Sequence, residues 1–221
     1  MKVADYIAEY LEKYTKHIFC GNGGTVVNLL DSISNKEGIT EIPFQNEQGA
    51  AIAAEAYSRI TGKLGVAIAT SGPGMVNLIQ GIACAYFDSI PTLYIVGAPP
   101  TNHLKNGRQI RQLGFQEMDV VDIVKPITKY AVLLKDPYLI KYELDKLIYL
   151  ATSENPGPVV LDIPDDIQRM DIGNPEELKS FVPQNISDYS FLTSKIYEML
   201  HLIRESERPV AIIGGGVKIS H

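Results

Sequence analysis

The sequence predicts an α/β fold, a doubly wound and mostly parallel six-stranded sheet with helices on both faces. Short apolar segments alternate with longer segments in which apolar side chains recur at helical spacing. Several short segments, such as residues 65–70, are apolar throughout, which is typical of strands buried on both faces of a parallel sheet. The alternation therefore indicates strand–helix–strand units.

The first expected elements of this pattern lie near the N-terminus. Residues 3–14 carry apolar side chains three or four positions apart and predict a helix. A buried strand is expected over residues 17–20, followed by a glycine turn and a second helix over 27–33. The turn is not a dinucleotide-binding loop, because Gly-x-Gly-x-x-Gly would need a glycine at Val26. Its glycines indicate either positive φ or a close approach of another group to the backbone.

A strand over residues 39–44 passes directly into an alanine-rich helix that Gly62 ends. Glu47 is expected at or just before the start of this helix, at the carboxyl end of a strand, where ligands bind in open α/β sheets. On position alone, such an acid more often complements the helix dipole.

The strand over residues 65–70 runs into the turn 71–74, where Pro73 and its flanking glycines suit a tight entry to a helix over about 75–87. The exposed N–H groups of that helix would lie beside whatever the turn faces. The next strand is expected over residues 92–96.

A polar loop over residues 98–112 precedes the remaining elements of the first domain. We expect a strand over 128–134, a helix over 137–153 and a sixth strand over 159–163. The first domain is therefore expected to span residues 1–170.

Residues 171–190 are polar, contain proline and predict a linker. A helix over 191–205 and a strand over 209–213 follow, too little to form a domain. We therefore interpret residues 191–221 as the beginning of a truncated second domain.

Composition excludes several classes of protein. A formal net charge of −6 over 221 residues, without any Lys/Arg run, argues against a nucleic-acid partner. The N-terminus is amphipathic rather than a signal peptide, and no apolar run approaches the ~20 residues that span a membrane, which predicts a cytoplasmic location. Cys20 and Cys84 both lie in apolar surroundings and are expected to be reduced core thiols.

Common catalytic patterns are also missing. The four histidines do not cluster, which predicts no metal site. Ser71 lacks the Gly-x-Ser-x-Gly pattern, and no phosphate-binding Gly-x-x-x-x-Gly-Lys loop occurs, so hydrolase and nucleotide triphosphatase functions are disfavoured. A parallel sheet would bring a set of polar groups to one edge: Glu47, Asn77, Gln116 and two glycine turns. One carboxylate, two amides and bare backbone suit a flat, hydrogen-bonding heterocycle.

At this point the sequence resembles the pyrimidine-binding domain of thiamine-diphosphate enzymes of the acetolactate synthase type. The resemblance covers about residues 1–170, through ordered motifs at 46–51, 57–63, 70–77, 88–91, 114–117, 125–129 and 157–164. The segment 208–216 resembles the opening of that family's central domain. The resemblance implies the thiamine-diphosphate-binding version of the predicted fold.

The resemblance also implies roles for particular residues. Glu47 would be catalytic, hydrogen-bonding the aminopyrimidine ring so that acid–base catalysis passes through the cofactor, and Gln116 would face the reacting centre. The residues implied to bind the cofactor are Gly23, Gly24, Glu47, Pro73, Gly74 and Asn77.

The function implied is a transferase or lyase that decarboxylates a 2-keto acid, with pyruvate expected, and adds the activated aldehyde to a second carbonyl. Gly21-Asn22 stand where the family usually has Tyr-Pro, which leaves the acceptor open. Three alternatives remain: a keto-sugar acceptor in polysaccharide biosynthesis, simple 2-keto acid decarboxylation, and a non-catalytic regulatory or binding domain.

One family segment is missing from these 221 residues, the Gly-Asp-Gly…Asn sequence that holds Mg²⁺ and the diphosphate in a C-terminal domain. The resemblance therefore implies the N-terminal part of a larger enzyme that works as a homodimer or dimer of dimers. We expect the 221 residues alone to be inactive. The sequence leaves the binding of FAD open.

Overall fold

The computed structural model describes residues 1–183 and 190–219. The chain divides into two compact units, Met1–Phe181 and Val182–His221. Each unit is considered by itself.

The first unit contains the six expected strands. They are β1 (His17–Cys20), β2 (Thr40–Pro43), β3 (Gly65–Ala69), β4 (Thr92–Ala98), β5 (Tyr130–Leu133) and β6 (Pro158–Pro164). Its α-helices are α1 (Val3–Leu11), α2 (Val27–Ser34), α3 (Glu47–Thr61), α4 (Pro73–Phe87), α5 (Val120–Val124), α6 (Ile140–Thr152) and α7 (Asp165–Arg169). Short 3₁₀ turns are η1 (Gly24–Val26), η2 (Thr101–His103), η3 (Lys125–Ile127), η4 (Pro137–Leu139) and η5 (Pro175–Glu177).

All strand pairs in the sheet are parallel, in the order β2-β1-β3-β4-β6-β5. The longest pairing joins β4 to β6, from Thr92 opposite Pro158 to Ala98 opposite Pro164. The predicted α/β class and six-stranded sheet are confirmed. The sheet is parallel throughout, whereas the sequence predicted only that it is mostly so.

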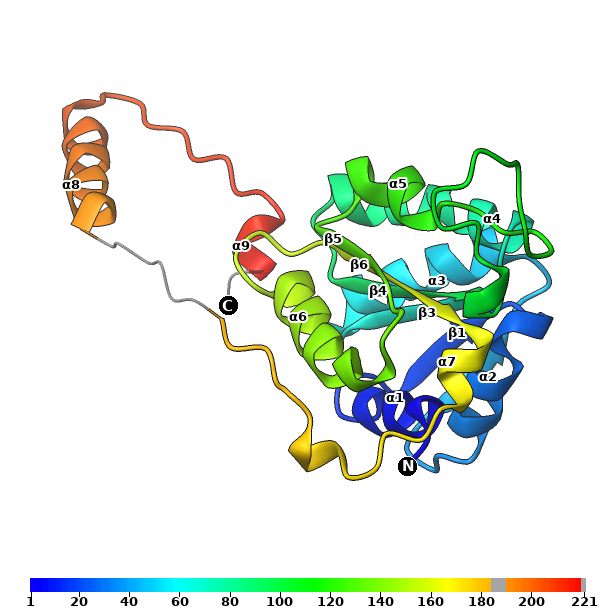
Figure 1. Cartoon of the computed structure of the whole chain (residues 1–221). Coiled ribbons are helices and arrows are strands. Elements are labelled where there is room, and N and C mark those ends of the chain that lie inside the picture. The colour runs from blue at the N-terminus through cyan, green and yellow to red at the C-terminus, as the bar shows by residue number, and fades with distance from the viewer. Residues whose placement is uncertain (184–189, 220–221) are drawn as a thin grey trace. The chain divides into compact units, whose positions relative to one another are not determined.

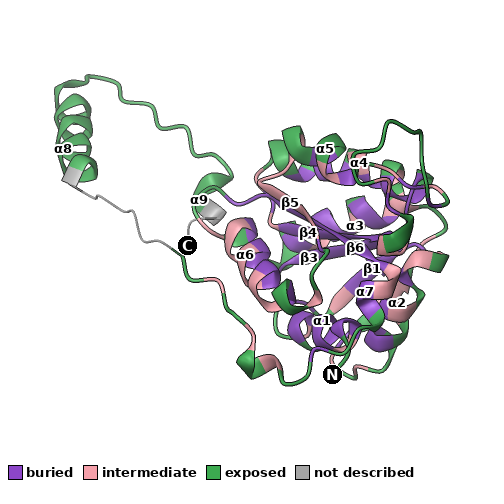
Figure 2. Cartoon of the chain, viewed as in Figure 1, coloured by how far each residue is buried: buried purple, intermediate pink, exposed green. Residues whose placement is uncertain are grey.

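Each face of the sheet carries its own apolar core, because successive side chains of a strand point to opposite faces. Ile18 of β1 packs with α1, α2 and α6, while its neighbour Phe19 packs with α3 and α4. The buried segments of these helices line the sheet in Figure 2, and Figure 1 shows the sheet between the two helical layers. The arrangement explains why the central strands are apolar along their whole length.

The first unit extends beyond the expected boundary at residue 170. The backbone N–H of Ile172 donates to the carbonyl of Met1 at 2.9 Å, and Ile172 is buried. Further on, the ring of Phe181 packs against Tyr142 and Tyr149, with ring centroids 5.5 and 5.7 Å apart. Residues 171–181 therefore belong to the packed unit, so the part of the expected linker that separates from it begins at residue 182. Residues 184–189 of that linker lie outside the described residues.

In the second unit, the predicted helix is α8 (Ser190–Glu205), and a short helix α9 (Gly216–Ile219) follows. The predicted strand at 209–213 was wrong, since the described residues there have no regular structure. A strand exists only by pairing with another strand, and the described part of this unit offers none. Val210, Ile212 and Ile213 are exposed.

A buried acid lies on the α5 side of the sheet. Asp162 of β6 is only 2% exposed, and its strand neighbours in the sheet are Val96 and Leu133. Burial raises the pKa of the Asp162 carboxyl to about 8, because the charged form is poorly solvated there. The native state therefore keeps a proton that the unfolded chain has already lost.

This buried acid predicts a pH-dependent stability. The pKa of Asp162 is higher in the folded than in the unfolded chain, so the free energy of unfolding should fall as pH rises from about 4 to about 8 and then level off. The contribution of one group is at most about 1.4 kcal/mol per pH unit. Asp162→Asn should remove it. Urea denaturation at pH 5, 6.5 and 8 tests this, and an unchanged pH slope in the variant would contradict the prediction.

Candidate active site

The chain adds β2 on one side of β1 and β3 on the other, so the direction in which the sheet grows reverses at β1. From β1 the chain moves outward to β2, then returns to place β3 on the other side of β1. The loops after β1 and β3 lead into α2 and α4, which pack on opposite faces of the sheet. Such a topological switch point, at the carboxyl ends of the strands, is where ligands bind in doubly wound sheets.

Glu47 is the first residue of α3, which follows β2 at this edge of the sheet. The side chain of Asn46 caps the helix by accepting a hydrogen bond from the N–H of Gln48 at 2.8 Å. Gly62 ends the helix in the left-handed conformation, as expected. The capped start holds the half-buried Glu47 side chain at a fixed position.

Two elements surround the Glu47 carboxyl. The side-chain amide of Asn77, one turn into α4, donates to Oε2 of Glu47 at 2.9 Å. On the Oε1 side, a Cβ added at Gly21 would lie 3.1 Å from Oε1, and one added at Gly74 would lie 3.2 Å from it. Only glycine lets the two backbone turns approach so closely. One oxygen of Glu47 is thus held by an amide, and the other faces two bare backbone turns.

The paired glycines of the first turn differ in their surroundings. A Cβ at Gly23 would stand 2.2 Å from the Cβ of Thr70, whereas one at Gly24 would meet no atom within 4 Å. Gly23 is therefore required by the packing of the turn after β1 against the end of β3. Gly24 is not required by any described contact.

Gln116 lies at the same edge of the sheet. Its own backbone is in the left-handed region, with φ of +56°, and it rests on Gly72, where an added Cβ would come 2.6 Å from the Cβ of Gln116. Gly72 also has positive φ, at +63°, and Pro73 then starts α4. The structure thus brings the turn after β3, Gln116 and the Glu47 cluster together through shared backbone contacts.

Sequence analysis missed a set of side chains that fix these turns. The hydroxyl of Thr25 lies 2.9 Å from that of Thr70 and accepts a hydrogen bond from the N–H of Ser71 at 3.2 Å. The carbonyl of Thr25 accepts from the side-chain amide of Gln168 at 2.7 Å. Thr25 therefore ties the turn after β1 to the turn after β3 and to α7. No local pattern marks it, because Gln168 is far away in the sequence.

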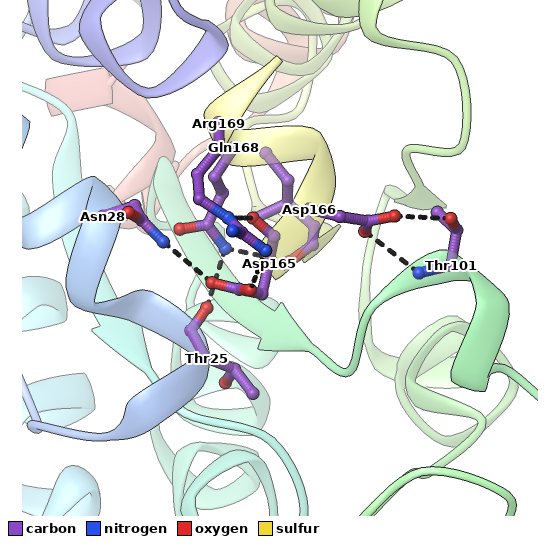
Figure 3. A network of polar contacts seen from close by, with 8 residues as sticks. Thr25, Asn28, Thr101, Asp165, Asp166, Gln168 and Arg169 are labelled. Carbon is purple, nitrogen blue, oxygen red and sulfur yellow. Dashed lines mark hydrogen bonds and ion pairs between the residues drawn. The ribbon is translucent and has the colours of Figure 1, made fainter.

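Figure 3 shows the polar contacts that side chains of α7 make with Thr25, Asn28 and Thr101. Asp165 accepts from Asn28 at 2.8 Å and pairs with Arg169 at 2.8 Å. Asp166 accepts from both the N–H and the hydroxyl of Thr101, at 2.9 and 2.5 Å. The loops after β1 and β4 are thereby joined at the carboxyl edge of the sheet.

Other motif residues serve the fold. Arg59 of α3 pairs with Glu55 one turn earlier and with Asp88 at 2.6 Å. The hydroxyl of Ser58 donates to the carbonyl of Pro91 at 2.8 Å. These contacts fasten the end of α3 to the segment after α4, at the edge of the sheet opposite to Glu47.

Comparison with known proteins places the chain in a family. A family model described as "Thiamine pyrophosphate enzyme, N-terminal TPP binding domain" matches residues 1–123, more than half of the chain. The chain belongs to this family. The match includes Glu47, Asn77 and Gln116, whereas the supporting residues of α7 lie beyond it.

Curated relatives extend the match to almost the whole chain. It is 37% identical over 215 residues to the acetolactate synthase large subunit of Buchnera aphidicola, covering 96% of the chain and 36% of that protein. It is 36% identical over 203 residues to the acetolactate synthase large subunit of Lactococcus lactis, covering 92% and 34%. It is 36% identical over 223 residues to the chloroplastic acetolactate synthase of Arabidopsis thaliana, covering 97% and 32%. The chain of this thiamine pyrophosphate family member spans about a third of the length of these relatives.

Two features are absent from the described residues of this family member. No group of three or more His, Cys, Asp or Glu side chains there could hold a metal ion. No helix among them is long and apolar enough to cross a membrane.

The two glycines of the first turn should respond differently to the same substitution. Gly23→Ala should destabilise the first unit by about 1–3 kcal/mol, because the new methyl group collides with Thr70. Gly24→Ala should stay within about 0.5 kcal/mol of the wild type, because its methyl group meets nothing. Urea denaturation compares the two, and equal stability of the variants would refute the contact.

The hydrogen bond between Asn77 and Glu47 gives a test that depends on pH. Asn77→Asp should put two carboxyls within hydrogen-bonding distance, so repulsion between like charges should make the variant less stable at pH 8 than at pH 5. Asn77→Ala should cost about 1 kcal/mol at both pH values. Thermal unfolding measures both, and a pH-independent loss in Asn77→Asp would mean that the pair is not in contact.

Proposed function

We propose that this chain supplies the pyrimidine side of a thiamine-diphosphate site in an acetolactate synthase-like carboligase. The enzyme would decarboxylate a 2-keto acid, with pyruvate as the donor, and add the activated aldehyde to a second carbonyl. The observation that carries the proposal is the Glu47 carboxyl, held by Asn77 on one oxygen and lined by Gly21 and Gly74 at the other.

The residues present fit this cofactor. Gly21 and Gly74 leave the space that the Glu47 carboxyl occupies and that a larger residue would fill, and Asn77 and Gln116 add amide groups that can donate and accept. The turns at 21–24 and 71–74 contain no Lys or Arg, which suits an uncharged ring better than a phosphate. Gly23, Gly24, Pro73 and Gly74 would lie along the ring, and Glu47 would hydrogen-bond one of its nitrogens. When bound, thiamine diphosphate supplies the electron sink that makes loss of carbon dioxide from a 2-keto acid feasible.

The hydrogen bond between Asn77 and Glu47 supports a role for Glu47 in proton transfer. Oε2 accepts from Asn77, so Oε1 would be the atom that holds a proton against the cofactor or takes it back. Asn77 fixes the plane of the carboxyl, and the capped start of α3 fixes its position. Gln116 would orient the reacting group from the opposite loop.

The rest of the proposal concerns the protein of which this chain is a part. Mg²⁺ and the diphosphate would be held beyond these residues, in a homodimer or dimer of dimers, and residues 191–221 would begin a central domain. FAD binding stays open, and a cytoplasmic location is part of the proposal. The relatives are named acetolactate synthases, which favours acetolactate synthase-like carboligation over transfer to a keto sugar, simple decarboxylation or a non-catalytic role.

The first experiment measures pyruvate consumption by the complete protein containing this chain, with thiamine diphosphate and Mg²⁺. Glu47→Gln should lower turnover by about 10²- to 10⁴-fold, because the amide cannot transfer a proton. Cofactor binding, followed by calorimetry, should change much less. Acetolactate among the products supports carboligation, whereas acetaldehyde alone supports simple decarboxylation.

The control is Glu37→Gln, the same chemical change at an exposed acid after α2, which should leave turnover unchanged. If Glu47→Gln consumed pyruvate as fast as Glu37→Gln, Glu47 would be only a helix-terminal acid. The family would then account for the fold and not for this residue's chemistry.

A further inference from the structure

A second acidic site lies away from Glu47, where α5 packs on β5 and β6. A cavity of about 510 Å³ opens there, walled by residues 104–107, 117–122 and 131–133, and Asp162 lines it. Its volume is within the range of small-molecule sites, about 300–1,000 Å³. The cofactor site proposed above uses none of these residues.

Two buried acids line this cavity, and their surroundings differ. Glu117 accepts hydrogen bonds from the backbone N–H groups of Lys105 and Leu113, one on each oxygen. Asp162 is 2% exposed, yet among the described residues nothing donates a hydrogen bond to its buried Oδ1. A carboxyl so deeply buried without a partner is costly, since buried charges are normally paired. Glu117 is a satisfied structural acid, and Asp162 is not.

The other charged groups at the cavity are two lysines, each with a hydrogen-bond partner, and two exposed acids. Lys105 pairs with Asp119, and Lys135 donates to the side-chain oxygen of Asn106 at 2.9 Å. Asp122 is exposed, and no described residue pairs with it. Lys105 is thus paired with an acid and Lys135 with a neutral amide, and the cavity lining holds four acidic side chains against two lysines.

We propose that this cavity binds an organic cation, an ammonium or guanidinium group carried on an apolar body. The cationic head would donate to Asp162, and the body would lie against the apolar wall of Val120, Ala131 and Leu133. A divalent metal fits less well, because the described residues hold no cluster of three possible ligands. An anion would meet four acidic side chains, and only Lys135 of the two lysines is not paired with an acid.

Ionisation of Asp162 should control this binding. Burial raises the pKa of Asp162 to about 8, so the free carboxyl is mostly protonated at pH 7 and must release its proton to pair with a cation. The charged groups that face it are Lys105, Glu117, Asp119, Asp122 and Lys135. Affinity for a cation should therefore be about tenfold higher at pH 9 than at pH 7.

The test is a titration of the 221-residue chain with n-butylammonium chloride, followed by ¹H–¹⁵N NMR at pH 7 and pH 9. The shifts should map to the cavity walls, and Kd should fall about tenfold at the higher pH. The uncharged n-butanol should bind at least tenfold more weakly at pH 9. Equal binding of the two probes, or shifts that map elsewhere, would overturn the proposal without any variant.

Two matched substitutions complete the test. Asp162→Asn should weaken n-butylammonium binding at pH 9 about tenfold or more and abolish its pH dependence. Asp122→Asn, the same change at an exposed acid of the same cavity, should leave Kd within about twofold. Equal loss in both variants would show a general attraction to acids and would count against a site at Asp162.

The cation could come from a free ligand or from a Lys or Arg of the protein beyond this chain. Repeating the titration with the complete protein separates the two sources. Binding that persists there supports a free ligand. Loss of binding, with n-butylammonium still bound by the 221-residue chain, supports a side chain of the same protein in the cavity.

Discussion

The parallel pairing of all six strands is the constraint on which the arrangement of this molecule depends. Because the strands run the same way, the loops after β1, β2, β3, β4 and β6 all emerge at one edge of the sheet. The chain reverses its winding between β1 and β3, so the turns after these two strands diverge to opposite faces and leave room between them. Glu47, which starts the helix after β2, reaches that place from the neighbouring strand.

Much of this edge could be predicted from local sequence. The position of Glu47 after an apolar strand, the helical spacing from Pro73 to Asn77, and the glycine turns each depend on a few adjacent residues. Parallel strands then bring such positions together without further information. Gly23 is a case in which the residue type was predicted to matter, and the structure supplies the reason, the close contact with Thr70.

Features that depend on distant contacts could not be predicted in this way. Thr25 and Gln168 meet across most of the first unit, and neither has a local pattern that marks it. Phe181 lies in a polar segment, and only the rings of α6 make it part of the packed unit. The apolar segment 209–213 has the composition of a strand, but composition does not supply a partner strand.

The hydrogen bonds that an acid receives separate structural from chemical roles better than its position in a motif. Glu117 follows Gln116 directly in a family motif, yet both of its oxygens are occupied by backbone N–H groups, and it holds its loop in place. Glu47 accepts one amide at Oε2, and we propose that its Oε1 serves in proton transfer. Asp162 receives no described donor at Oδ1, so burial alone raises its pKa. A bound proton or a cation would remove the cost of burying its negative charge. Three acids near the same sheet thus differ in what they can do because they differ in the number of donors that reach them.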